Sequence, residues 1–86
     1  MCGIVGISSS PDSPETGRRQ IALFRDLLIR SQSRGRESAG MAWRNGPDEI
    51  VTAKIRGTVR TLLKNVDSSG RQPLPENALL EMIGHS

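Results

Sequence analysis

The sequence predicts a small α+β domain in which helices back a mixed sheet containing an antiparallel hairpin. Two observations support this fold class. Strand-like and helix-like segments follow one another in the order strand, helix, strand, strand, short helix, strand. An Asn-Gly pair separates the two central strand-like segments, as is typical of a hairpin turn. The chain has 86 residues, which is enough for one small domain with a marginal core.

The first two elements are predicted to be a strand and an amphipathic helix. Residues 2–8, CGIVGIS, form an apolar run with two glycines, and residues 18–32 have apolar residues at helical spacing. Four apolar side chains are expected to form the core stripe of this helix: Ile21, Phe24, Leu27 and Leu28. Ser13 followed by Pro14 also resembles a helix start, with Ser13 as the N-cap.

The middle of the chain predicts a β-hairpin. Residues 39–44 and 49–56 are strand-like, and Asn45 and Gly46 are expected to supply the positive φ angles of the turn. The second of these segments alternates between two faces, with Ile50, Thr52, Lys54 and Arg56 on one and Val51, Ala53 and Ile55 on the other. This period of two indicates a strand with one buried face.

The last third of the chain is predicted to hold two short elements. Residues 58–65 indicate a short helix, residues 66–76 a loop, and residues 77–86, NALLEMIGHS, either a short helix or a strand. This apolar run reaches the last residue without a C-cap or a polar tail. We therefore expect the domain, residues 1–86, to be incomplete at its C-terminus.

Composition disfavours several classes of function. The net charge is +3, but the arginines are scattered among acidic residues without interleaved aromatic residues, which disfavours nucleic-acid binding. There is no signal peptide and no apolar segment approaching the ~20 residues that span a bilayer, so we expect a cytoplasmic protein without membrane contact. One cysteine and one histidine, far apart in sequence, do not indicate a metal site, and no cofactor is expected.

The lone cysteine occupies position 2, and it becomes the terminal residue once Met1 is removed. The unperturbed pKa values of an α-amine, about 7.7–8.0, and of a thiol, about 8.5, are closely matched. The α-amine can therefore accept the thiol proton, so that Cys2 supplies both a nucleophile and a general base. Gly3 would leave room for a substrate over the backbone. The alternative is that Cys2 is simply a small buried hydrophobic residue.

Two motifs together resemble a known family. They are MCGIVGI at residues 1–7 and SRGRESAG at residues 33–40, and three further segments agree in order: GMAWRN, AKIRGTVRTLL and IGHS. The chain is similar to the glutaminase domain of class II glutamine amidotransferases, which are N-terminal-nucleophile (Ntn) hydrolases. The resemblance implies the first portion of a four-layer αββα sandwich with antiparallel sheets. Glu37 slightly favours the amidophosphoribosyltransferase branch, because hexosamine-synthase relatives more often have aspartate there.

The resemblance also implies a reaction. The Cys2 thiolate attacks the side-chain amide of L-glutamine, a γ-glutamyl thioester forms and ammonia leaves, and water then releases glutamate. The ammonia passes to a synthase or transferase domain. Arg34 and Gly35 match the residues that hold the N-terminal residue, and His85 and Ser86 match the edge of the glutamine pocket.

The family pattern continues beyond GHS with an arginine, an Asn-Gly pair and an aspartate, so we expect most of the glutamine pocket to be missing from this chain. Loss of one oxyanion-hole donor alone costs about 10²–10³ in rate. One alternative is therefore an inactive truncated fragment that serves only as a binding or assembly module and pairs with a complementing chain. Another is a small arginine-rich protein that binds polyanions, which the mixed charges disfavour.

Overall fold

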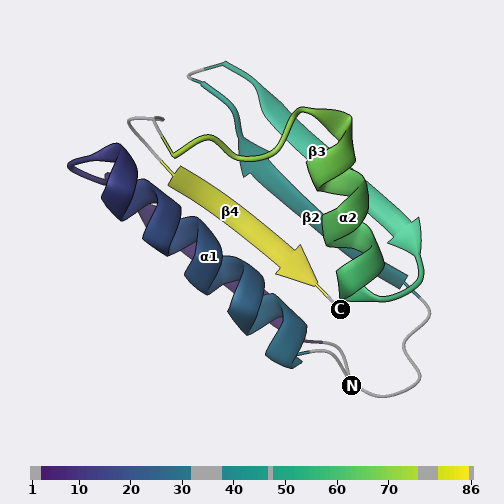
Figure 1. Ribbon diagram of the computed structural model, residues 1–86. Coiled ribbons are helices and arrows are strands. Elements are labelled where there is room, and N and C mark those ends of the chain that lie inside the picture. Colours follow the sequence, from purple (N-terminus) through teal and green to yellow (C-terminus); the bar gives the residue numbers. More distant parts are fainter. Residues whose placement is uncertain (1–2, 32–37, 47, 76–79, 86) are drawn as a thin grey trace.

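The computed structural model describes residues 3–31, 38–46, 48–75 and 80–85. Its six elements occur in the predicted order: β1 (Ile4–Ser9), α1 (Pro14–Ser31), β2 (Ser38–Arg44), β3 (Ile50–Arg56), α2 (Val59–Ser69) and β4 (Leu80–His85). The strands form one sheet, and both helices lie on the same face of it (Figure 1). The α+β fold class is confirmed. The expected mixed sheet is wrong, because every strand pair in the described residues is antiparallel.

The strand order in the sheet is β1-β4-β2-β3, so the last strand lies between the first two. Since β4 is antiparallel to both of its neighbours, β1 and β2 run in the same direction with β4 between them. By the same reasoning β3 and β4 run in the same direction with β2 between them. Each helix connects one of these two separated pairs, so two crossovers place both helices on one face.

Helix α1 begins at Pro14, four residues before the predicted start, and Ser13 is its N-cap as expected. The Ser13 hydroxyl oxygen accepts a hydrogen bond from the Thr16 backbone N–H at 3.2 Å. Phe24 and Leu28 are fully buried, which confirms them as core residues. Leu27 is 40% exposed, so its predicted place in the core stripe is wrong. It lies about 100° around the helix from Leu28 and therefore outside the row that faces the sheet.

The turn between β2 and β3 differs from the predicted two-residue turn. Gly46 has a φ of +89°, but Asn45 does not have a positive φ. The Asn45 backbone N–H instead donates to the Glu49 carbonyl oxygen at 2.8 Å, so the connection is longer than the Asn-Gly pair alone. The alternation of β3 is confirmed, because the side chains of one predicted face are exposed and those of the other are partly buried.

For the last two elements, the structure extends the predicted helix and decides between the two alternatives for the final segment. Helix α2 continues to Ser69, beyond the predicted end at residue 65, and stops where Gly70 has a left-handed φ of +75°. At its start the Thr58 hydroxyl oxygen accepts from the Thr61 backbone N–H at 3.2 Å. Of the two alternatives for the last segment, the strand is correct for Leu80–His85, and residues 77–79 and 86 lie outside the described residues.

The core lies between the helices and the sheet. Its buried hydrophobic residues are Phe24, Leu28, Ala39, Met41, Trp43, Val59, Leu62, Leu63, Val66, Leu80 and Met82. The Trp43 indole N–H donates to the Arg71 carbonyl oxygen at 3.0 Å, which satisfies its one polar group inside the core. None of the helices in the described ranges is long and apolar enough to cross a membrane.

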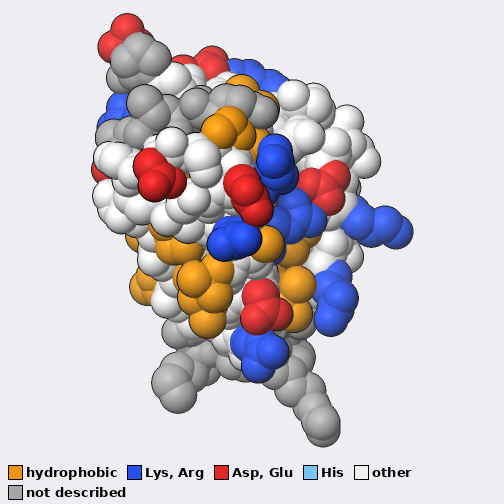
Figure 2. All heavy atoms as spheres, turned by 60° about the vertical axis from the view of Figure 1, so that its left-hand side comes forward, with side chains coloured by type: hydrophobic (Ala, Val, Ile, Leu, Met, Phe, Trp, Pro, Cys, Tyr) orange, Lys and Arg blue, Asp and Glu red, His pale blue; other side chains and the backbone are white. Residues whose placement is uncertain are grey.

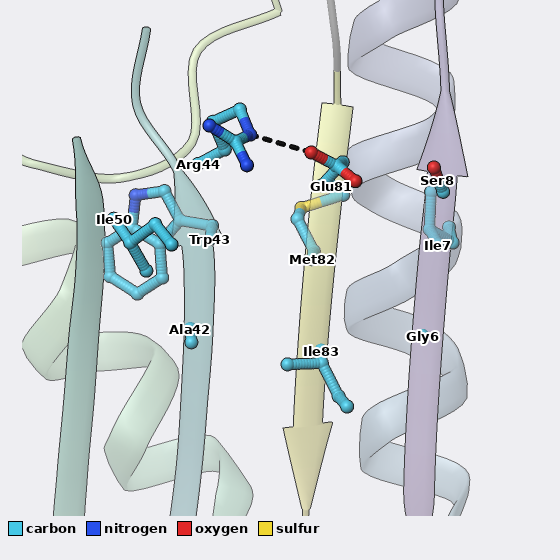
Figure 3. Close-up of a pocket in the computed structure, with 10 residues that line it drawn as sticks. All are labelled: Gly6, Ile7, Ser8, Ala42, Trp43, Arg44, Ile50, Glu81, Met82 and Ile83. Atoms are coloured by element: carbon cyan, nitrogen blue, oxygen red, sulfur yellow. Dashed lines mark hydrogen bonds and ion pairs between the residues drawn. The ribbon is translucent and has the colours of Figure 1, made fainter. Parts of the chain in front are cut away.

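Within the described residues, no helix covers the opposite face of the sheet, which we call the helix-free face. Figure 3 looks onto this face, with both helices behind the strands. Ile4, Ile50 and Ile83 are 72%, 65% and 55% exposed, and all three point away from the helices. The described residues thus form one helical layer and one sheet, and the other side of the sheet presents isoleucines to solvent.

Candidate functional site at one edge of the sheet

Most of the predicted site residues lie outside the described residues. These are Cys2, Arg34, Gly35 and Ser86, together with Met1. His85 is the predicted site residue that the structure describes, and it is the last residue of β4. The geometry of the site is therefore built from His85 and from the described residues that flank the other four in the sequence.

The flanking residues meet at one edge of the sheet. Gly3, which follows Cys2, packs against the end of α1: a methyl group at Gly3 would lie 2.7 Å from the Ser31 carbonyl oxygen. Ser31 and Ser38 bracket the segment that contains Arg34 and Gly35. The end of α1, the end of β4 and the start of β2 all lie toward the same end of the sheet in Figure 1, and β4 is the strand between β1 and β2 there. His85 lies at this same edge.

Strand register fixes the neighbours of His85. It is opposite Ile4 of β1 on one side and Gly40 of β2 on the other, with Lys54 of β3 next in the row. All four belong to the helix-free face, because side chains alternate along a strand. The imidazole lies over Gly40: a methyl group built there would come within 2.6 Å of His85 Nε2. The last glycine of RGRESAG, Gly40, has no side chain and therefore leaves the space that the His85 ring occupies.

A hollow of about 390 Å³ adjoins His85 on the helix-free face. Ile4, Ala42 and Ile83 give it apolar walls, and Thr52, Lys54 and His85 add three polar side chains. It is wide open to solvent, so it is a shallow surface depression and does not enclose a ligand. Such a depression can hold an apolar side chain or a small polar molecule against the sheet, next to the edge at which β1 begins.

A larger hollow of about 580 Å³ occupies the other half of the same face, further from the β1 start. An ion pair crosses it: Arg44 Nε donates to Glu81 Oε1 at 2.6 Å, joining β2 to β4 (Figure 3). Sequence reasoning missed this pair because the residues are 37 positions apart and the β2–β4 register is not visible in the sequence. The smaller hollow, not this one, is lined by the predicted site residue His85.

Three side chains away from this edge have shifted pKa values. The Arg25 guanidinium donates to Asp67 and lowers the pKa of that carboxyl group, while the hydrogen bond to Asp67 raises the pKa of Arg25. The pKa of Glu49 is lowered by its hydrogen bond from Arg71. On the side of the molecule that Figure 2 turns forward, Lys and Arg side chains are interspersed with Asp and Glu. This mixture agrees with the scattered charges of the sequence.

In the described part of the chain, no three His, Cys, Asp or Glu side chains come together in a way that could hold a metal ion. Comparison with protein-family models, with curated proteins and with solved structures finds no match to this chain. The resemblance therefore depends on the motifs themselves, and the reaction it implies stays a prediction.

Proposed function

We propose that the chain provides the nucleophile half of a glutaminase site, in which Cys2 hydrolyses the side-chain amide of L-glutamine through a γ-glutamyl thioester. One observation supports this above all. The described residues next to each predicted site residue gather at a single edge of the sheet: Gly3, Ser31, Ser38 and His85. The described parts of the motifs at residues 1–7, 33–40 and 83–86, which are far apart in sequence, thus lie toward the same end of the sheet, as a shared site requires.

In this proposal the α-amine of Cys2, exposed by loss of Met1, accepts the thiol proton. The thiolate then attacks the amide carbon, and the protonated amine returns the proton to the departing ammonia. Water hydrolyses the thioester and regenerates the thiol. Arg34 and Gly35 hold the N-terminal residue, and His85 borders the glutamine. The released ammonia serves a synthase or transferase domain, with a slight preference for an amidophosphoribosyltransferase.

We further propose that the sheet belongs to an Ntn-type αββα sandwich. The helix-free face supports this, because Ile4, Ile50 and Ile83 are exposed on it, and a second sheet packed at a distance of about 10 Å would cover them. The two hollows on this face are spaces that interdigitating side chains from such a sheet would fill.

The test is glutamate release from glutamine by the purified chain, with Cys2→Ala as the control and the intact mass measured on the same sample. We expect the mass to lack Met1 and any glutamate release to depend on Cys2. We also expect a glutamine analogue bearing an electrophilic ketone to add its mass to Cys2. Retention of Met1, or labelling and release that persist in Cys2→Ala, would contradict the proposal.

A second candidate is that the chain acts only as a binding or assembly module, and the helix-free face is the observation that favours it. Exposed isoleucines on one sheet face promote association. We would compare the sedimentation of the chain with that of Ile83→Asp, which places a charge in the middle of this face. Self-association that Ile83→Asp abolishes, in a chain without Cys2-dependent chemistry, would favour the module over the enzyme.

A further inference from the structure

A groove of about 490 Å³ lies between α1 and α2, on the helical layer of the molecule. Arg25 and Ile29 line it from α1, and Arg60, Leu63 and Lys64 are among the residues that line it from α2. The two helices cover the sheet side by side in Figure 1. The groove belongs to a different layer from the helix-free face, so it is independent of the glutaminase proposal.

The groove has an excess of positive charge. Three basic residues and one acidic residue line it. Arg25 and Asp67 neutralise each other, because the guanidinium donates to both carboxylate oxygens at 2.8 and 2.9 Å. Arg60 and Lys64 supply the excess. They are exposed and one helical turn apart, and neither forms an ion pair within the residues that the structure describes.

The position of Arg60 is unusual for a cation. Thr58 is the N-cap of α2, so Arg60 is the second helical residue, and the first turn contains no acidic residue. The positive end of the helix dipole favours anions there and disfavours a guanidinium. Departures from such local preferences are expected where a residue serves binding. An anion placed between Arg60 and Lys64 would be attracted by both side chains and by the start of the helix.

The other lining residues indicate what kind of anion fits. Leu63 is almost fully buried in the core, whereas Ile29 is only partly buried, so Ile29 is the apolar side chain beside the basic ones that a ligand could contact. No aromatic side chain lines the groove, so bases of a nucleic acid would have nothing to stack on. We propose that the groove binds an acidic, amphipathic peptide segment of a partner protein, whose carboxylates meet Arg60 and Lys64 and whose apolar side chains contact Ile29.

The test measures binding of a fluorescein-labelled helical peptide, with Leu on one face and Glu on the other, to the full chain by fluorescence anisotropy. Arg60→Glu combined with Lys64→Glu should weaken binding about tenfold or more, because two attractions become repulsions. The matched control, Lys54→Glu combined with Arg56→Glu, makes the same change in net charge on the opposite face of the sheet. It should change the affinity less than about twofold. Trp43 fluorescence and thermal unfolding verify that both variants are folded.

Several outcomes would overturn the proposal. They are no binding by the unaltered chain, an equal loss in the two double variants, and equal affinity for a version of the peptide with Ser in place of Leu. Tighter binding of a single-stranded oligonucleotide of equal charge, with the same dependence on Arg60 and Lys64, would assign the groove to nucleic acid instead. Binding should also weaken as salt is added, since the pairs are exposed.

Discussion

The imidazole of His85 occupies the space over Gly40 on the neighbouring strand, so that a single methyl group on Gly40 would come within 2.6 Å of Nε2. The two residues are directly opposite each other in the β2–β4 register. They also belong to the two motifs, RGRESAG and IGHS, that were singled out separately in the sequence. The contact explains why a side chain at position 40 and an imidazole at position 85 are mutually exclusive in this arrangement.

Gly40→Ala should displace the His85 ring with only a modest change in stability. The ring is the end of a rotatable side chain, so we expect the free energy of unfolding to change by less than about 1 kcal/mol. The imidazole NMR resonances of His85 should shift, and Cys2-dependent chemistry should fall if His85 borders the glutamine. The control is Gly6→Ala, on the same face, where the nearest atom is the Met82 carbonyl oxygen at 3.6 Å. Unchanged His85 resonances in Gly40→Ala would contradict the predicted displacement.

Gly84→Ala should destabilise the fold much more. Gly84 faces α1, and a methyl group there would lie 2.9 Å from Leu28 Cδ2 and 3.2 Å from Phe24 Cζ. Both side chains are fully buried, so neither can move without opening the core. We expect a loss of about 1–3 kcal/mol in urea unfolding, as is typical of overpacking.

The matched control for Gly84→Ala is again Gly6→Ala. Gly6 is in the neighbouring strand, paired with Ile83, and its methyl group would make only ordinary contacts. Because alanine suits a strand interior better than glycine by roughly 0.5–1 kcal/mol, Gly6→Ala should be neutral or slightly stabilising. If the two variants unfold at the same urea concentration, the predicted clash of a methyl group at Gly84 with Leu28 and Phe24 does not destabilise the fold.

Local patterns in the sequence were sufficient to predict the order of the elements. The alternation of β3 and the spacing of Phe24 and Leu28 depend on residues a few positions apart, and both are confirmed. The strand order and the contacts across the sheet depend on residues far apart, and these were not predicted. The insertion of β4 between β1 and β2, and the Arg44–Glu81 pair that it creates, require a register between segments that the sequence does not encode locally.

The candidate site likewise combines features that the sequence shows with features that only the sheet order reveals. The residue types at positions 2 and 85 indicate chemistry, and their sequence motifs can be recognised. The fact that His85 lies over Gly40 and opposite Ile4 follows only from the sheet order. Leu27 shows that burial is hard to predict even within one helix. It is apolar and adjacent to the buried residue Leu28, but it is exposed because no other described element packs against it.

Asp67→Asn should lower stability near pH 7 and have no effect in acid. The hydrogen bond from Arg25 lowers the pKa of Asp67 in the folded state below its unfolded value. A group of this kind contributes stability above its unfolded pKa, and the contribution disappears as the pH falls through the folded pKa. The side chains of the pair are 32% and 49% exposed, so we expect a loss of at most about 1 kcal/mol at neutral pH.

Urea unfolding of Asp67→Asn and of the unaltered chain, near pH 7 and again near pH 2, measures this difference. Asp26→Asn is the control, because its i,i+4 pair with Arg30 lies within a single helix and does not join α1 to α2. It should cost less than Asp67→Asn, about 0.3–0.5 kcal/mol. If Asp67→Asn lowers the free energy of unfolding by the same amount in acid as at neutral pH, the stabilisation does not depend on the charge of Asp67, and the prediction is wrong.

Arg34→Lys should weaken Cys2-dependent chemistry although the charge is retained. If Arg34 holds the N-terminal residue, it does so with the planar donor fork of its guanidinium, which a lysine ammonium does not reproduce. Charge-assisted hydrogen bonds contribute about 1.5–3 kcal/mol, so we expect kcat/KM, or the rate at which the electrophilic glutamine analogue labels Cys2, to fall about tenfold or more. The matched control is Arg30→Lys, since Arg30 is an exposed residue of α1 whose guanidinium donates to Asp26 at 2.9 Å. Equal rates for Arg34→Lys and Arg30→Lys would remove Arg34 from the proposed site while leaving the role of Cys2 open to its own test.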